Sequence, residues 1–352
     1  MAASGHQGLV VVAFCGAGGS SLGVRAALPD ASVVGIDNDP DACRTHHAAG
    51  FATIQADVAA YPHERPLGAQ GLWLSPPCPA FSSAGRRGGR AHMPALLRHL
   101  RRWRPGDATW AGPPLVWLVT EPLRWVLAVR PEWAVCEQVP EVLPLWHALA
   151  ERFRPEGYSA WAGVLNAADY GVPQARQRAV LMASRSRPAV PPAPTHASRP
   201  RARPDGTEVL AWVTMADALE RRGLRRDAKL PRWCYEPPAT TVQVDRRIGR
   251  PGHKDRSGGE GQFDRDAVTL TLDELAAVQD FPRGYRFAGT HSSIARQIGN
   301  AVPVGLAAAV VGALAGSSEE GRSGSDLAPG EQGLITELVA LSREELAWLK
   351  GP

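Results

Sequence analysis

The stretch LVVVAFCGAGGSSLG, residues 9–23, decides the fold of this chain of 352 residues. Its first six residues are all apolar, which is typical of a strand buried on both faces. The glycines that follow allow a tight turn and a close approach of backbone to a ligand, and a short helix is expected to run to Ala27. Strand, glycine turn and helix predict the first unit of a parallel α/β sheet. The spacing is not GxGxxG, and no lysine follows to make a P-loop.

The second and third predicted strands end at acidic residues, Asp37 and Asp57. Because the carboxyl ends of parallel strands meet at one edge of a sheet, we expect both acids beside the glycine turn. The first could accept hydrogen bonds from both hydroxyls of a ribose, and the second from an adenine amino group. The pattern therefore predicts a site for a nucleoside-bearing cofactor. His46 and His47 lie on the helix between them, and we interpret both as solvated surface.

A cysteine set among prolines occurs in SPPCPAFS, residues 75–82, directly after an apolar run. The prolines cannot continue a strand, so Cys78 is expected in a stiff turn at the carboxyl end of that strand. A thiolate there would be a strong nucleophile, although a buried cysteine can also be a small hydrophobe. Residues 82–104 are rich in Gly and Arg. We favour a mobile loop that closes over a polyanion, and the alternative is a solvated helix.

Two further groups of polar residues border apolar strands. Glu137 follows the run at residues 133–136, and Gln174, Arg176 and Arg178 alternate before another apolar run. Alternation places those three side chains on one face of an extended segment. A surface edge strand could show the same pattern.

Composition and cysteine usage limit the class of protein. Hydrophobic residues make up 44% of the chain, the net charge is +4, and only three of the 39 basic residues are lysine. The arginine excess suits phosphate and guanine contacts, but it is mostly what a GC-rich genome encodes. The five cysteines form no CxxC pair, and we find no metal-binding pattern, signal region or membrane-spanning run. We expect a soluble cytoplasmic protein that binds neither metal nor membrane.

Further helices, strands and linkers are expected along the rest of the chain. Helices are expected near residues 116–129, 142–153, 215–222, 272–278 and 303–314, and a strand near 160–164. Residues 185–204 and 246–262 are interpreted as linker and flexible loop. Residues 316–332 are interpreted as low-complexity linker, followed by a short amphipathic helix.

Taken in order, these segments resemble the DNA cytosine-5 methyltransferase family. The resemblance covers residues 8–315 and rests on the order and spacing of its motifs. They are FCGAGG (14–19), PCPAFS (77–82), EQV (137–139), QARQR (174–178), QDFP (279–282) and GNAVP (299–303).

The resemblance implies a role for each matching residue. Cys78 would add to C6 of a flipped-out cytosine, Glu137 would contact N3 and N4, and Arg178 would lie near O2 with support from Arg176. Residues expected to hold S-adenosyl-L-methionine are Phe14, Gly16, Gly18, Gly19, Asp37, Asn38, Asp57, Leu118, Asn300 and Val302. Residues expected at double-stranded DNA are Ser82, Arg86, Arg87, Arg90 and Gln174.

Three features depart from the family pattern. Gln138 replaces the usual Asn, so Glu137 could be displaced and activity reduced, and Gln138→Asn would then be the more active protein. Pro79 and Ala80 differ from the usual residues of the nucleophile turn. The target-recognition region between the QARQR motif and the segment that begins at Pro238 offers only about residues 184–236, which predicts a short or relaxed target.

We therefore predict a Rossmann-like, doubly wound, mostly parallel sheet with a small irregular target-recognition domain. The expected divisions are a catalytic domain (8–183), a target-recognition region (184–270), returning motifs (271–315) and a tail (316–352). The expected protein is a monomeric bacterial or phage DNA methyltransferase, with a restriction enzyme as a genetic rather than physical partner. The alternatives are an RNA cytosine-5 methyltransferase and a non-catalytic DNA-binding relative. An NAD-dependent oxidoreductase would leave the later motifs unexplained.

Overall fold

The computed structural model describes residues 8–62, 68–77, 81, 89–104, 114–224, 230–236, 238–242, 247–248 and 267–315. Its centre is a sheet of seven strands in the order β3-β2-β1-β4-β5-β7-β6. The strands are β1 (Leu9–Ala13), β2 (Ser32–Asp37), β3 (Ala52–Gln55), β4 (Gly71–Leu74), β5 (Trp133–Gln138), β6 (Ser159–Asn166) and β7 (Gln177–Ser184). Neighbouring strands are parallel except for β7, which runs antiparallel to β5 and β6. The predicted doubly wound, mostly parallel sheet is confirmed.

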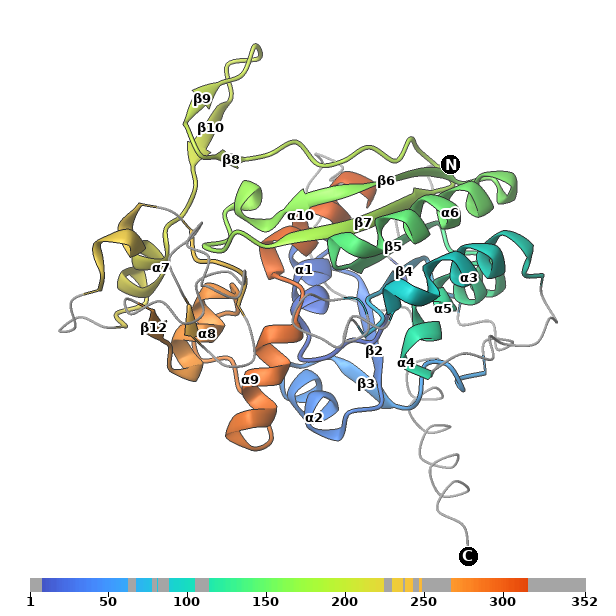
Figure 1. Ribbon diagram of the computed structural model, residues 1–352, viewed down its shortest axis with the longest axis horizontal. Coiled ribbons are helices and arrows are strands. Elements are labelled where there is room, and N and C mark those ends of the chain that lie inside the picture. The colour runs from blue at the N-terminus through green and yellow to red at the C-terminus, as the bar shows by residue number, and fades with distance from the viewer. Residues whose placement is uncertain are drawn as a thin grey trace, which may run out of the picture.

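Both faces of the sheet are covered by helices (Figure 1). In β1, Val10 and Val12 pack into one hydrophobic cluster, whereas Val11 and Ala13 pack into another. Because successive side chains of a strand point to opposite faces, the uninterrupted apolar run supplies both layers of core. The covering helices are α1 (Gly19–Ala27) and α10 (Val304–Ala315) on one face, and α5 (Glu121–Val129) and α6 (Leu143–Phe153) on the other.

The remaining helices differ in part from expectation. They are α2 (Pro40–Ala48), α3 (Gly89–Arg102), α4 (Pro114–Trp117), α7 (Met215–Arg221), α8 (Leu272–Val278) and α9 (His291–Asn300). Short 3₁₀ turns are η1 (Leu118–Thr120), η2 (Pro140–Val142), η3 (Arg154–Glu156), η4 (Ala167–Tyr170) and η5 (Arg232–Tyr235). The single helix expected at 116–129 is divided into α4, η1 and α5, and α9 was not expected.

The mobile loop favoured for residues 82–104 is wrong for the part that the structure describes, residues 89–104. Residues 89–102 form the helix α3, and its Leu96 and Leu100 are fully buried. Arg98, Arg101 and Arg102 are exposed. An apolar side that packs on the core, opposite a charged side in water, stabilises the helix over a loop.

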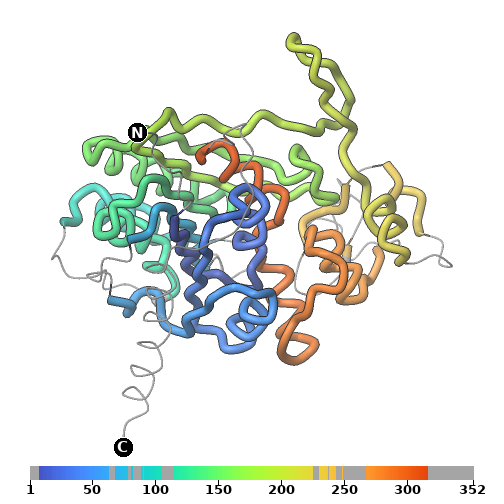
Figure 2. Tube along the Cα trace, turned by 180° about the vertical axis from the view of Figure 1, so that it is seen from behind, coloured from blue at the N-terminus to red at the C-terminus, as the bar shows by residue number. Residues whose placement is uncertain are grey.

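A small region follows β7. Residues 185–204, interpreted as linker, contain β8 (His196–Ala197) and β9 (Arg201–Ala202), which pair with β10 (Glu208–Ala211). The β9–β10 hairpin projects from the molecule in both views (Figures 1 and 2). A second pair is formed by β11 (Arg247–Ile248) and β12 (Val268–Thr269). The proposed division of the chain into domains at residues 184 and 271 stays a prediction.

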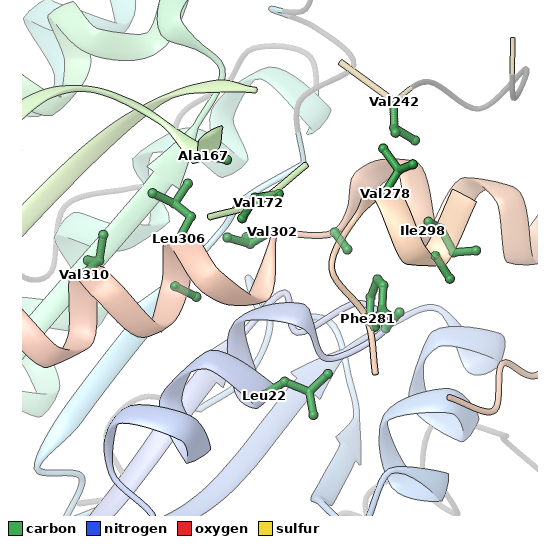
Figure 3. Packing of buried hydrophobic residues seen from close by; sticks show 14 of the residues in the cluster. Leu22, Ala167, Val172, Val242, Val278, Phe281, Ile298, Val302, Leu306 and Val310 are labelled. Atoms are coloured by element: carbon green, nitrogen blue, oxygen red, sulfur yellow. The ribbon is translucent and has the colours of Figure 1, made fainter. Parts of the chain in front are cut away.

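The C-terminal helices return to the large sheet. Figure 3 shows side chains of α1, α8, α9 and α10 meeting in one apolar cluster, among them Leu22, Val278, Ile298 and Leu306. By length and composition alone, the helical stretch His291–Ala315 could cross a membrane, because an 18-residue window within it has a mean hydropathy of 1.9. Half of that window is buried inside the fold, and α10 packs closely on α1: a Cβ on Gly23 would lie 2.4 Å from the Ala307 Cβ. Its apolar character is therefore accounted for by packing in this core.

Candidate functional site at the carboxyl edge of the sheet

The glycine turn after β1 has a backbone that explains its composition. Phe14, Gly16 and Gly18 all have positive φ, at 58°, 51° and 91°. A Cβ on Gly19 would lie 2.1 Å from the Val302 carbonyl oxygen, so only glycine allows this approach of the chain after α9. A Cβ on Gly16 would meet nothing within 4 Å, so open space borders the turn there. The turn thus combines a rigid backbone with room for a ligand.

Asp37, at the end of β2, holds the glycine turn in place. Its Oδ2 accepts the Gly16 N–H at 2.8 Å, and its Oδ1 accepts the Asp39 N–H at 2.9 Å. Burial raises the pKa of the Asp37 carboxyl, while the backbone N–H groups of Asp39, Gly16 and Asn38 oppose that rise. Each carboxylate oxygen retains a second lone pair, which leaves acceptor capacity for ligand hydroxyls.

Asp57 lies next to this corner, one strand further along the edge. The Ala56 N–H donates to the Asp37 carbonyl at 2.9 Å, which joins the ends of β2 and β3. The Asp57 side chain is exposed and accepts the Ala59 N–H at 2.9 Å. The two acids and the glycine turn therefore lie at three adjacent strand ends, as the strand order predicted.

The other residues predicted at the cofactor have more varied positions. Val302 is buried with its carbonyl against Gly19, and Leu118 is half-buried in η1. Asn38 and Asn300 are exposed. Their contacts with a cofactor stay predictions.

Glu137 and Arg178 form a buried ion pair at the ends of β5 and β7. The Arg178 Nε lies 3.0 Å from the Glu137 Oε1, and the two side chains are 10% and 8% exposed. The Arg178 guanidinium also donates to the Gln177 carbonyl at 2.7 Å. A planar guanidinium fixed in this way orients one carboxylate oxygen and leaves the other available. Both residues were singled out in the sequence because they border apolar strands, and the antiparallel pairing of β7 with β5 brings them together.

Gln138 links the Glu137 strand to the segment that leads into Cys78. Its Nε2 donates to the Pro76 carbonyl, and its Oε1 accepts the Val139 N–H at 2.5 Å. The same segment is held from β1, since the Ser75 N–H donates to the Ala13 carbonyl at 3.3 Å. Both the nitrogen and the oxygen of the longer amide are thus hydrogen-bonded, and Glu137 keeps its ion pair. Cys78 itself, with Pro79, Ala80, Ser82, Arg86 and Arg87, lies outside the described residues; Arg90 belongs to α3, and its side chain is not described.

Gln174 and Arg176 lie in a buried network instead of facing outward. Gln174 is 0% exposed: its amide donates to the Gln279 Oε1 at 2.5 Å and accepts the Val242 N–H at 2.8 Å. Arg176 donates to the Gly299 carbonyl at 2.8 Å and to the Val242 carbonyl at 3.3 Å. All three alternating side chains are buried, so the surface edge strand is excluded. The DNA contact predicted for Gln174 is corrected, because its amide is enclosed by the protein. These contacts are consistent with the supporting role that was predicted for Arg176 beside Arg178.

Three residues were missed or misread from the sequence. His46, predicted to be solvated, is fully buried: its Nε2 lies 2.8 Å from the Ser21 Oγ and its Nδ1 lies 2.7 Å from the Thr53 Oγ1. Burial lowers the pKa of His46 to about 3, so the ring is neutral. His47 is exposed, as expected. Tyr285 donates from its hydroxyl to the Ala17 carbonyl, bracing the glycine turn from the C-terminal segment.

Asp280 is the third of these residues. It adopts φ 68°, and its Oδ2 accepts the Gly305 N–H at 3.0 Å at the start of α10. An Asp at positive φ is uncommon and marks a position fixed by its surroundings. Among the residues that the structure describes, no group of three or more His, Cys, Asp or Glu side chains could hold a metal ion.

The fold and this edge define a class: a Rossmann-like protein with glycines and two acids at three adjacent strand ends, beside a buried Glu–Arg pair. The profile of the C-5 cytosine-specific DNA methylases matches residues 10–102, 112–228 and 221–316. The chain belongs to that family.

Individual relatives agree with this assignment. The chain is 28% identical over 323 residues to the Type II methyltransferase M.HgiDI of Herpetosiphon aurantiacus, covering 84% of this chain and 90% of the relative. It is 26% identical over 251 residues to the Type II methyltransferase M.HindV of Haemophilus influenzae, covering 70% and 74%. The crystal structure of the S. pombe Dnmt2 methyltransferase shares the fold, with a TM-score of 0.60, 16% identity, and 86% and 97% of the two chains covered.

Proposed function

We propose that this chain transfers a methyl group from S-adenosyl-L-methionine to C5 of cytosine in duplex DNA, through a covalent bond between Cys78 and C6 of the base. The observation that carries the proposal is the buried Glu137–Arg178 pair, with its 3.0 Å Nε–Oε1 distance. It lies beside the segment that leads into Cys78, which Gln138 fastens at the Pro76 carbonyl. Nucleophile, base-binding acid and arginine would then face one pocket.

The residues at the strand ends fit the cofactor. Open space at Gly16 accommodates a ligand, Asp37 has acceptor capacity for ribose hydroxyls, and Asp57 is exposed one strand away. Phe14, Gly18, Gly19, Asn38, Leu118, Asn300 and Val302 complete the proposed cofactor set. When bound, the sulfonium of this cofactor supplies an electrophilic methyl group.

The side chains of the protein account for the activation of the base. Cytosine C5 is a poor nucleophile until the Cys78 thiolate adds to C6, which moves electron density toward C5. Glu137 hydrogen-bonds N3 and N4 and favours protonation of N3 as the thiolate adds, while Arg178 stabilises the negative charge at O2. After methylation, loss of the C5 proton and of the thiolate restores the aromatic ring. The base must leave the duplex stack to reach these groups.

Partners and location follow from the same proposal. Duplex DNA would be held in part by Ser82, Arg86, Arg87 and Arg90. We place the protein in the bacterial cytoplasm, where a cognate restriction enzyme would be a genetic partner, because the relatives named above are bacterial Type II methyltransferases. We propose that it acts as a monomer.

Transfer of labelled methyl groups to unmethylated duplex DNA tests the proposed function. The parent should label DNA and Cys78→Ser should not, because a serine hydroxyl is a far weaker nucleophile than a thiolate. Sequencing that reports 5-methylcytosine would then give the target. Labelling of RNA but not DNA would favour the RNA enzyme, and cofactor binding without any transfer would favour the non-catalytic relative.

The hydrogen bonds of Gln138 reverse the expectation from the sequence that Gln138→Asn is the more active protein. Asparagine is one methylene shorter than Gln138 and would not reach both the Pro76 carbonyl and the Val139 N–H. We therefore expect Gln138→Asn to methylate roughly tenfold more slowly than the parent, as for loss of one hydrogen bond that positions a reacting group. Single-turnover methyl transfer at saturating cofactor measures this. A faster Gln138→Asn variant would show that the family asparagine is the better residue here.

A further inference from the structure

The turn that follows β3 carries Asp57 and is held by two sets of hydrogen bonds. On one side, the Asp57 carboxylate accepts the Ala59 N–H at 2.9 Å, and the Asp57 carbonyl accepts the Tyr61 N–H at 2.9 Å. On the other side, the carbonyl oxygens of Val58, Ala59 and Tyr61 accept hydrogen bonds from α5. An exposed acid is thus placed on a turn whose backbone is otherwise fixed.

Arg124 of α5 makes those bonds. Its Nη2 donates to the Val58 carbonyl at 2.9 Å and to the Ala59 carbonyl at 3.2 Å, and its Nη1 donates to the Tyr61 carbonyl at 3.4 Å. The neighbouring Trp125 adds its Nε1 to the Val58 carbonyl at 3.3 Å and stacks its ring on Tyr61, with centroids 5.9 Å apart. One guanidinium therefore binds three carbonyls of a single turn.

Glu121 fixes the orientation of that guanidinium. The Arg124 Nε donates to the Glu121 Oε2 at 2.8 Å, and the Nη2 lies 2.6 Å from the same oxygen. The side chains of Arg124 and Glu121 are only 11% and 3% exposed. Burial raises the pKa of Glu121 to about 7, against the opposing effect of Arg124. The buried carboxylate thus holds the guanidinium from one side while the turn carbonyls hold it from the other.

We propose that Arg124 is a positioning residue for cofactor recognition: it fixes the turn from Val58 to Tyr61 so that Asp57 meets the amino group of adenine. The inference rests on the proposed function, which assigns Asp57 to the adenine ring. Arg124 itself touches only the protein. Its loss should therefore affect discrimination for the amino group more than general affinity for the nucleoside.

Two ligands that differ at that group separate these effects. S-adenosylhomocysteine carries the adenine amino group, and S-inosylhomocysteine has an oxo group in its place. We expect the parent to bind the adenosyl ligand at least tenfold more tightly by calorimetry, as for one hydrogen bond to a charged acceptor. In Arg124→Met this ratio should fall toward one, mainly through weaker binding of the adenosyl ligand.

Arg130→Met is the matched control. Arg130 follows α5 and pairs with Glu156 at 3.3 Å in an exposed site. Its removal should leave the ratio unchanged. In an Asp57→Ala background the ratio should already be near one, and Arg124→Met should not lower it further.

The outcomes separate this inference from the function it rests on. A folded Arg124→Met protein that keeps the parental ratio would overturn the positioning role alone. A parent that binds neither ligand would overturn the proposed function, and this inference with it. If Arg124→Met does not fold, Arg124→Lys carries the same comparison, since an ammonium cannot bind three carbonyls in the geometry of the guanidinium.

Discussion

Glu137→Gln is expected to slow methyl transfer to duplex DNA by roughly 100- to 10,000-fold, the usual contribution of a positioned acid or base. Glutamine keeps the size of the side chain and can hydrogen-bond the base, but it cannot exchange a proton with N3. Cofactor binding should not change, because Glu137 lies on β5, apart from the glycine turn. Single-turnover transfer with the cofactor saturating isolates the effect.

The control for this prediction is Glu151→Gln, at an exposed position of α6. It removes the same charge away from the proposed pocket and should leave the rate unchanged. If Glu137→Gln were as fast as that control, the assignment of Glu137 to the base would be wrong.

Arg178→Met is expected to lower the free energy of unfolding by about 3–5 kcal/mol, because it leaves the buried Glu137 carboxylate without its partner. The guanidinium and carboxylate are only 10% and 8% exposed, so water cannot readily replace the missing contact. Urea unfolding followed by fluorescence of the buried tryptophans measures the change. Methyl transfer should also be lost, since the proposed contact at O2 disappears.

A double variant distinguishes the ion pair from a general packing defect. Combining Arg178→Met with Glu137→Gln removes both charges and should recover much of the lost stability, but no activity. Arg187→Met, at an exposed position after β7, is the single-variant control. Equal stability of Arg178→Met and that control would contradict the pairing.

The sheet could be predicted from the sequence because most of its strands are short apolar runs, and several of them end at acids. Asp37 and Asp57 were placed correctly for the same reason: strand ends of a parallel sheet share one edge. Glu137 and Arg178 were noted beside apolar strands, and only the resemblance to a family gave them roles at the base; the Glu137–Arg178 ion pair was not predicted. Its geometry depends on the antiparallel pairing of β5 with β7, which no local pattern specifies.

The errors concern residues whose partners are distant in the sequence. Gln174 was predicted at DNA through the resemblance to a family, yet its partners Val242 and Gln279 are supplied by later segments and enclose its amide. His46 looked like helix surface, but Ser21 and Thr53 enclose it. The β9–β10 hairpin was hidden because its first strand lies in the Pro- and Arg-rich stretch of residues 185–204. In each case tertiary contacts, rather than local propensity, decide the outcome.

The most direct test of the central claim is covalent trapping of Cys78 on duplex DNA in which cytosine is replaced by 5-fluorocytosine. Fluorine cannot leave C5 as a cation, so the bond between the Cys78 sulfur and C6 should persist after methyl transfer. We predict that mass spectrometry of the digested complex will find a nucleotide on the peptide that contains Cys78, and none when Cys78→Ser is used. A methylated DNA product with no such adduct, or an adduct at another cysteine, would contradict the account.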